Sequence, residues 1–296
     1  MLHELEQDGI RLNRDEPMSQ HTAFRIGGAV TAMVFPDGEA QLIQVLARLK
    51  QTGTRPFILG NGSNLLAADE AIDKIVIKTS DGLSEIRRSG ENTVYAAAGA
   101  QLSQIAVFAQ NEGLSGLEFA HGIPGTLGGA IVMNAGAYGG EMAQVVTSVR
   151  YVDEQGEIAV ATGDALGFAY RHSRFSHTDC VVLSAEIKLI PGNPADIRHK
   201  MDDLAARRRQ SQPLNYPSAG STFKRPKVGY AAAMIEEAGL KGYTVGGAKV
   251  SEKHAGFIVN HNKASCADVR QLMAHVQEVV FVHTGIMLEP EVEFIE

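Results

Sequence analysis

The sequence predicts an α+β protein made of more than one domain, and three observations support this. Apolar strand candidates alternate with an amphipathic helix over residues 29–80, and hairpin candidates follow at 84–99 and 146–163. A Pro/Ser/Gly-rich connection over 207–220 then precedes two further helices. At 296 residues the chain is long enough for about two domains.

The N-terminal part follows a strand–helix–strand order. The segment 29–35 (AVTAMVF) predicts a strand, and the turn PDGEA comes next. Leu42, Val45 and Leu49 recur at helical spacing and predict a helix after that turn. Two further strands are expected at 56–60 and 74–80, so the region has the pattern of a βαβ unit.

The middle of the chain combines hairpins with helices. The first hairpin is expected to turn at residues 90–92 and the second at 153–156, with a helix at about 101–112 between them. A strand follows at 180–190. Asn193 as N-cap and Pro194 at the first helical position then predict a helix reaching about residue 209.

The last third is expected to be mainly helical. One helix is predicted at about 229–238 and closed by Gly239. A second begins at Ser265, has Asp268 in the capping-box position, and ends at Gly285. Residues 286–295 predict a closing strand.

Composition favours a globular protein of the cytoplasm without nucleic-acid or membrane partners. The chain is 44% hydrophobic and 21% charged, and its net charge of −7 disfavours general binding to nucleic acid. No apolar run approaches the roughly 20 residues of a membrane span, and the polar, acidic start does not resemble a signal peptide. Cys180 and Cys266 fit no metal pattern and are expected to be reduced.

Familiar catalytic patterns are absent from the sequence. It has no GxSxG, HExxH or GxxxxGK[ST] motif. The pairs His254/His261 and His275/His283 lack companion ligands, so no metal site is expected. Arg207, Arg208 and Arg209 fit a solvated helix face, with phosphate contact at a helix end as the alternative.

Two glycine-rich loops carry the strongest functional signal. Residues 60–64 (GNGSN) lack the GxGxxG spacing of a Rossmann site but can present backbone N–H groups to an anion such as a pyrophosphate. The second segment, 121–141 (HGIPGTLGGAIVMNAGAYGGE), contains seven glycines. The plain alternative is a series of tight turns, whereas the two loops together suggest a dinucleotide such as a flavin lying on the main chain.

Polar groups elsewhere add candidates for chemistry. Ser221 lies in PSAGSTFKRP and is followed by Lys224 and Arg225, which an exposed turn would also explain. The motif YRHSRF places arginines in an apolar context. Near the C-terminus Glu291 and Glu293 share one face of the predicted strand, and the spacing does not choose between them.

Taken in order, these motifs resemble one enzyme family. HTAFRIGG, ILGNGSNLL, GIPGTLGGAIVMNAGAYGGE, YRHSRF, SAGSTFKRP, AGLKGYTVGGAKVSEKHAGFIVN and LEPEVEF are similar to the UDP-N-acetylenolpyruvoylglucosamine reductases. The resemblance runs from about His21 to the C-terminus. The length, and the lack of an inserted tyrosine-bearing loop, resemble the shorter class of that family.

The resemblance implies the FAD-binding fold of vanillyl-alcohol oxidase and p-cresol methylhydroxylase, with an added C-terminal α+β domain. It implies a first FAD-binding subdomain at 1–80, joined by the returning strand 288–296. A second FAD-binding subdomain would cover 81–210, and a substrate-binding domain 211–287. FAD would be bound noncovalently, with His121 as the position to examine for a covalent link.

The implied reaction is the reduction of UDP-N-acetylglucosamine enolpyruvate to UDP-N-acetylmuramate for bacterial peptidoglycan, with NADPH as co-substrate. By resemblance Arg171 pairs with the substrate carboxylate, Glu291 donates a hydrogen bond if protonated, and Ser221 delivers a proton to C2. The implied substrate-binding residues are Lys224, Arg225, Lys241 and His254. The implied FAD-binding residues are Leu59, Gly60, Asn61, Gly62, Ser63, Asn64, Leu65, Gly122, Ile123, Pro124, Gly125, Thr126, Gly128, Gly129, Asn134, Ala135 and Gly136.

Two alternatives remain at this point. One is another FAD-dependent oxidase of the same fold, which would use oxygen as its acceptor. The other is a nonenzymatic protein that binds a flavin or a nucleotide-sugar. Such a binder has no need for the combination of Arg171, Ser221 and Glu291, which favours an enzyme.

Overall fold

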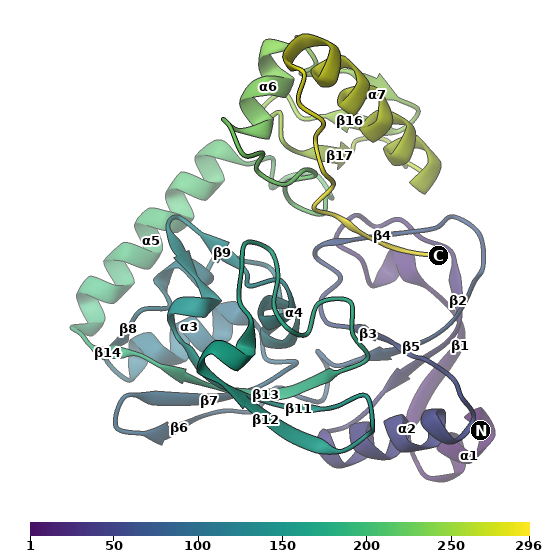
Figure 1. Ribbon diagram of the computed structural model, residues 1–296, viewed down its shortest axis with the longest axis vertical. Coiled ribbons are helices and arrows are strands. Elements are labelled where there is room, and N and C mark those ends of the chain that lie inside the picture. The colour runs from purple at the N-terminus through teal and green to yellow at the C-terminus, as the bar shows by residue number, and fades with distance from the viewer. The chain divides into compact units, whose positions relative to one another are not determined.

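A computed structural model describes residues 1–296 (Figure 1). Residue contacts divide the chain into two units, each assembled from separate segments. Unit 1 comprises Met1–Arg14, Ala32–Asn61 and Lys74–Arg207. Unit 2 comprises Asp15–Thr31, Gly62–Asp73 and Arg208–Glu296.

The first sheet has the strand order β1-β2-β5-β3. Its members are β1 (Arg11–Pro17), β2 (Ala29–Phe35), β5 (Ile72–Lys78) and β3 (Phe57–Leu59), with α2 (Glu39–Gln51) between β2 and β3 in the chain. β3 and β5 are parallel, and the apolar stripe of α2 is buried in one cluster with Ile75 and Ile77 of β5. The predicted βαβ elements are therefore confirmed.

Two elements in the polar lead-in, α1 (Leu2–Gln7) and β1, have no counterpart among the sequence predictions. β1 is largely exposed, so its sequence, RLNRDEP, has no alternating apolar pattern. Its strand conformation depends on pairing with β2, which is a tertiary effect.

The second sheet lies in unit 1 and confirms both predicted hairpins. Its order is β12-β11-β13-β7-β6, from β6 (Ile86–Gly90), β7 (Thr93–Ala97), β11 (Val146–Val152), β12 (Ile158–Thr162) and β13 (Val181–Lys188). Val181 and Leu183 pack into the cluster that contains α2, whereas Val182 and Ala185 belong to a second cluster. Residues 181 to 183 alternate with the period of two of a strand covered on both faces. A register shift of β13 against β11, from Ser184 opposite Arg150 to Val182 opposite Tyr151, changes this phase before Ala185.

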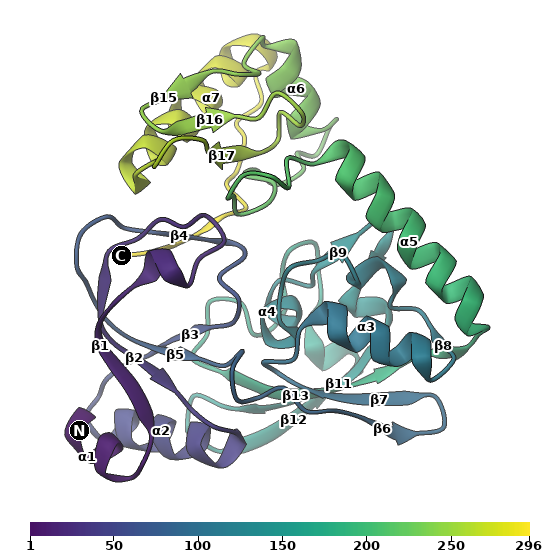
Figure 2. The same cartoon turned by 180° about the vertical axis from the view of Figure 1, so that it is seen from behind.

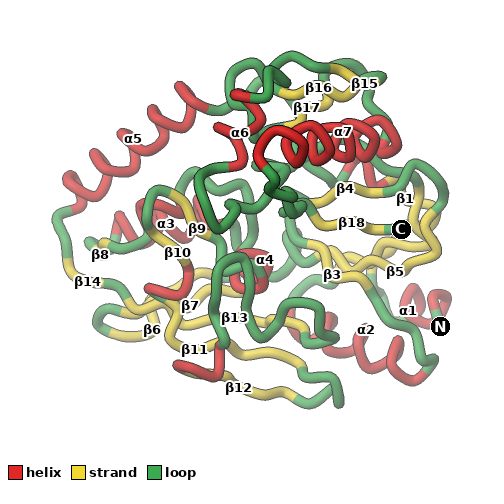
Figure 3. The backbone as a smooth tube through the Cα atoms, turned by 45° about the horizontal axis from the view of Figure 1, so that its top comes forward, coloured by secondary structure: helices red, strands yellow, loops and turns green.

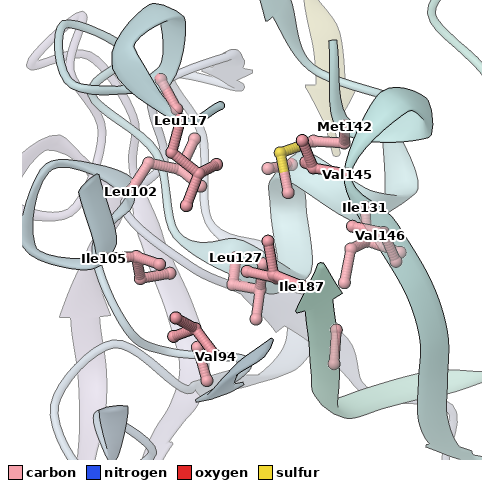
Figure 4. Packing of buried hydrophobic residues seen from close by; sticks show 14 of the residues in the cluster. Val94, Leu102, Ile105, Leu117, Leu127, Ile131, Met142, Val145, Val146 and Ile187 are labelled. Atoms are coloured by element: carbon pink, nitrogen blue, oxygen red, sulfur yellow. The ribbon is translucent and has the colours of Figure 1, made fainter. Parts of the chain in front are cut away.

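Helices α3 (Leu102–Asn111) and α4 (Leu127–Val132) supply much of that second cluster (Figures 1 and 4). Leu102, Ile105 and Leu127 pack there with Val94 and Ile187 of the sheet. α4 lies inside the glycine-rich segment, where the sequence predicted no helix. The remaining short elements of unit 1 are β8 (Leu114–Ser115), η2 (Glu118–Ala120), β9 (Gly136–Ala137), β10 (Gly140–Glu141), η3 (Met142–Gln144), η4 (Gly163–Leu166) and β14 (Ile190–Pro191).

Unit 2 contains a three-stranded antiparallel sheet with two helices (Figure 2). The strands are β15 (Thr244–Val245), β16 (Ala248–Val250) and β17 (Ile258–Asn260), and the helices are α6 (Ala231–Glu237) and α7 (Cys266–Thr284). They share one buried cluster. The sequence did not predict these strands, because two or three residues are too few to show a period.

Helix boundaries follow the predicted capping residues. The Ser265 hydroxyl accepts a hydrogen bond from the Asp268 N–H, and Gly285 ends α7 in a left-handed conformation with φ +71°. The Asn193 side chain accepts from the Ala195 N–H at 2.8 Å at the start of α5 (Pro194–Ser211). Capping residues act on neighbouring backbone groups, so the sequence by itself predicts where these helices begin and end.

The C-terminal strand returns to the first third of the chain. β18 (Glu293–Ile295) pairs in parallel with β4 (Leu65–Ala67), both in unit 2 (Figure 3). The predicted strand 286–295 is shorter in the structure, since only its last part is a strand. Pro290, which has no N–H to donate to a ladder, forms only an isolated bridge with Phe223.

Candidate active site

Gly60, the first residue of the loop 60–64, meets the second glycine-rich segment within unit 1. A Cβ atom added to Gly60 would lie 2.2 Å from Oγ1 of Thr126, so only glycine allows this approach. None of the backbone N–H groups of residues 60–64 donates a hydrogen bond to another protein group. Clustered N–H groups without acceptors are suited to an anion such as a diphosphate.

Gly128 and Gly129 at the start of α4 are glycines for different reasons. A Cβ on Gly128 would approach Ala98 to 3.2 Å, so the packing of the protein itself favours glycine there. A Cβ on Gly129 would meet nothing closer than Thr126 Oγ1 at 3.8 Å, and its N–H has no acceptor in the protein. No protein neighbour requires a glycine at residue 129. The open space beside the Gly129 backbone could instead be filled by a flat or phosphorylated group such as FAD.

Other predicted FAD-binding residues have internal roles. The buried Asn134 donates from Nδ2 to the Ala169 carbonyl at 3.0 Å and accepts from the Ala143 N–H at 2.9 Å. A Cβ on Gly136 would lie 2.7 Å from the Gly140 carbonyl, so a tight turn explains that glycine. Contact between these residues and a flavin stays a prediction.

The remaining predicted cofactor residues differ in exposure. Leu59 and Leu65 are buried, which leaves their backbone as the part able to meet a cofactor. Gly122, Ile123, Gly125 and Ala135 are partly exposed, and Pro124 is exposed. Gly62 has φ +58°, and a Cβ there would lie 2.1 Å from the His21 carbonyl, so backbone geometry requires a glycine at this position.

Arg171 lies at the tip of a tight turn in unit 1. Ala169 and His172 exchange backbone hydrogen bonds of 3.0 and 3.1 Å, and Arg171 between them has φ +53°. Side-chain bonds anchor the turn, from Asn134 to the Ala169 carbonyl and from the Ser173 hydroxyl to the Val132 carbonyl. A strained residue on an anchored turn is often a functional residue.

Unit 2 brings Ser221 and Glu291 onto adjacent backbone segments. The Glu291 N–H donates to the Thr222 carbonyl at 2.8 Å, and the Lys224 N–H donates to the Glu289 carbonyl at 2.8 Å. Glu291 therefore lies opposite Thr222, next to Ser221. Glu291 is partly buried whereas Glu293 is exposed.

Thr222 is a site residue that the sequence did not single out. It is 1% exposed, its N–H donates to the Gly256 carbonyl at 2.8 Å, and its hydroxyl accepts from the Ile258 N–H at 3.0 Å. These bonds fix the backbone immediately after Ser221. The sequence carried no signal for this role, because the burial of the Thr222 hydroxyl and its hydrogen-bond partners appear only in the folded chain.

Lys241 and His254 form a second polar group in unit 2. Lys241 pairs with Glu236, and Nδ1 of His254 accepts from the Gly256 N–H at 3.2 Å. Burial lowers the pKa of His254, and the charge of Lys241 lowers it further, although Glu236 opposes this. A neutral His254 with its Nδ1 occupied presents Nε2 as a hydrogen-bond donor.

The other predicted cations pair with neighbours on the surface. Lys224 lies 4.0 Å from Glu289, and the Arg225 guanidinium lies 4.2 Å from the centre of the Tyr230 ring. Arg207 pairs with Asp203 at 2.9 Å along α5, which fits the solvated-face interpretation. Exposed pairs of this kind are weak and can exchange for an anionic ligand.

No group of His, Cys, Asp or Glu side chains has an arrangement that could hold a metal ion. His275 instead stacks on Tyr243 with ring centres 4.4 Å apart, and His261 lies against Tyr216. None of the helices combines the length and the apolar character needed to cross a membrane.

Comparisons with known proteins identify the family of the chain. Residues 30–162 match the family model "FAD binding domain", and residues 212–295 match "UDP-N-acetylenolpyruvoylglucosamine reductase, C-terminal domain". The reductase of that name from Caldanaerobacter subterraneus subsp. tengcongensis is 47% identical over 294 residues, covering 99% of this chain and 96% of the relative. The chain belongs to the UDP-N-acetylenolpyruvoylglucosamine reductase family.

Further relatives extend this result. The UDP-N-acetylenolpyruvoylglucosamine reductase of Clostridioides difficile is 45% identical over 295 residues, covering 100% of this chain and 96% of the relative. The crystal structure of the Thermus caldophilus enzyme matches with a TM-score of 0.84 and 32% identity, over 97% of this chain and 100% of that one. A berberine bridge enzyme variant, at 16% identity and a TM-score of 0.51, covers 65% of this chain and 43% of its own. This match supports the fold alone, and the expected FAD-binding fold is confirmed.

Proposed function

We propose that Arg171, Ser221 and Glu291 carry the chemistry of this FAD-dependent reductase. The enzyme reduces UDP-N-acetylglucosamine enolpyruvate to UDP-N-acetylmuramate with NADPH as co-substrate, a step in bacterial peptidoglycan synthesis. The adjacent backbone segments of Ser221 and Glu291 support the roles of these two residues, and the strained, anchored turn supports the role of Arg171. FAD, when bound, supplies the two-electron chemistry that joins NADPH oxidation to hydride addition at C3 of the enol ether.

The role proposed for Arg171 is to bind the substrate carboxylate. Addition of hydride to C3 leaves negative charge at C2, which spreads into this carboxylate. A guanidinium is always charged and can make two parallel hydrogen bonds to a carboxylate. Fixed positive charge at that point stabilises the transition state more than the ground state.

Ser221 is the proposed proton donor to C2, and Glu291 the proposed hydrogen-bonding partner of the developing anion. A hydroxyl is a weak acid, but a carbanion-like centre is basic enough to take its proton when the two are in hydrogen-bond reach. The position of the Ser221 hydroxyl then decides whether the proton is transferred. The bonds of Thr222 to Gly256, Ile258 and Glu291 hold the adjoining backbone in place.

The proposed FAD contacts are the free N–H groups of residues 60–64 and the segment around Thr126 and Gly129. Lys224, Arg225, Lys241 and His254 are proposed to bind the anionic nucleotide-sugar. We also propose that FAD is noncovalent, that the protein works in the cytoplasm without nucleic-acid or membrane partners, and that substrate binding belongs to residues 211–287. FAD binding would then belong to 1–80, 81–210 and the strand 288–296.

Ser221→Ala is the direct test of the proposed chemistry. Flavin reduction by NADPH should be nearly unchanged, whereas anaerobic reoxidation by the enolpyruvyl substrate should slow by about 10²–10⁴-fold, the usual contribution of a general acid. Stopped-flow absorbance of the flavin separates these two half-reactions. Ser218→Ala, three residues earlier in the same segment, is the matched control and should change neither. An equal fall of both half-reactions in Ser221→Ala would remove Ser221 as the acid.

A further inference from the structure

Asn64, the last residue of the loop 60–64, is bonded to the strand that carries Glu291. Its Nδ2 donates to the Glu291 carbonyl at 2.9 Å, and its own carbonyl accepts from the Glu293 N–H at 3.0 Å. All three residues belong to unit 2. The residues after Asn64 continue as β4, which pairs with β18, so the loop and the strand are joined without interruption.

Glu291 is consequently held on both sides of its backbone. Its N–H donates to Thr222, on the segment of Ser221, and its carbonyl accepts from Asn64, on the glycine-rich loop. Only the second bond comes from a segment suited to bind the cofactor. Asn61, the same residue type in the same loop, makes no side-chain hydrogen bond to that strand.

We propose that Asn64 is a positioning residue that makes the placement of Glu291 depend on FAD bound at residues 60–64. The inference rests on the proposed function of that loop. A diphosphate bound to its free N–H groups would restrict the loop, and the Asn64 amide would transmit that restriction to the Glu291 peptide. Such coupling between two sites is reciprocal, so a ligand beside Glu291 should also tighten FAD binding.

Hydrogen exchange of the apoprotein with and without FAD tests the coupling independently of catalysis. In the wild type, FAD should slow exchange in the peptide containing residues 289–293 by about tenfold, the range expected when local opening is suppressed. In Asn64→Asp, which keeps the side-chain shape but loses the donor, saturating FAD should slow exchange there by less than about threefold. Asn262→Asp, at an exposed asparagine of unit 2 outside the proposed sites, should retain at saturating FAD the protection seen in the wild type.

The two half-reactions supply a second readout. With the flavin site saturated, Asn64→Asp should leave reduction by NADPH nearly unchanged and slow reoxidation by the substrate by about tenfold or more. Full protection of 289–293 by FAD in Asn64→Asp, or an equal loss of both half-reactions, would overturn the proposal. If Ser221→Ala shows that Ser221 is not the acid, the exchange result still decides the role of Asn64.

Discussion

Arg171 shows how local strain and function coincide at the scale of a residue. A left-handed backbone costs a non-glycine residue about 1–2 kcal/mol, and glycine would avoid that cost. Bonds from Asn134 and Ser173 hold the surrounding turn in place. Arg171 has φ +53° in spite of this cost. The strain agrees with the proposal that its guanidinium is needed to bind the substrate carboxylate.

Glu118 is a buried carboxylate outside the proposed catalytic set. It is 3% exposed, accepts from the Ser115 hydroxyl at 2.5 Å and the Gly116 N–H at 3.0 Å, and lies 3.6 Å from Lys200 of α5. Burial raises the pKa of Glu118, but these hydrogen bonds and the Lys200 charge together hold it below the ordinary 4.5. The ionised side chain therefore stabilises the fold.

Glu118→Gln should lower the free energy of unfolding by about 1–3 kcal/mol at pH 7, the cost of weakening a buried hydrogen-bonded group. The pH dependence of this stabilisation follows from the lowered pKa of Glu118 in the folded state. The stabilisation is complete above the ordinary carboxyl pKa and is lost as pH falls through the lower folded value. Urea midpoints at pH 7 and pH 4 should show the two proteins converging in acid. A constant difference would show that the charge is not responsible.

At the scale of elements, the glycines of the second loop separate into two groups. Gly128 and Gly136 have protein atoms where a side chain would be, so packing explains them. Gly129 has none, although it occupies a helix, where glycine is unfavourable. Gly128 and Gly136 shape the loop, whereas the open space beside Gly129 is where we propose that the cofactor lies.

Gly129→Ala should stabilise the apoprotein by about 0.5–1 kcal/mol, since alanine favours the helix and finds open space. FAD affinity should nevertheless fall, because the new methyl group would occupy the place proposed for the cofactor. Thermal melting of the apoprotein and fluorescence titration with FAD measure the two effects separately. Gly128→Ala is the control, and it should destabilise the apoprotein through contact with Ala98. Unchanged FAD affinity in Gly129→Ala would contradict this placement.

At the scale of the whole molecule, the protein and its substrate both carry negative charge. The protein carries a net charge of −7, while its substrate carries a diphosphate and a carboxylate. Binding therefore depends on local cations and backbone N–H groups rather than on the overall field. A cofactor test on all 296 residues includes each of these local groups.

The purified protein should be yellow, and acid precipitation should release FAD into the supernatant and leave a colourless pellet. Anaerobic addition of NADPH should bleach the flavin, and the enolpyruvyl substrate should restore its absorbance without oxygen. A yellow pellet would show a covalent flavin. His121, whose Nδ1 is buried without a hydrogen-bond partner, would then be the first residue to examine by mass spectrometry.

The sequence by itself determined the features that depend on neighbouring residues. It located the hairpins, the helix caps at Asn193 and Ser265, the two glycine-rich loops and the family, because turn chemistry, capping and motifs are local patterns. It missed α1, β1, β4, α4 and β15 to β17, which are short or exposed elements without a readable period.

Only the tertiary structure decided which distant groups meet. The contact of Gly60 with Thr126, the pairing of Thr222 with Glu291 and the bond from Asn64 to Glu291 join residues 66, 69 and 227 positions apart. Such contacts form when buried backbone groups find partners across the folded chain, and no spacing in the sequence specifies them.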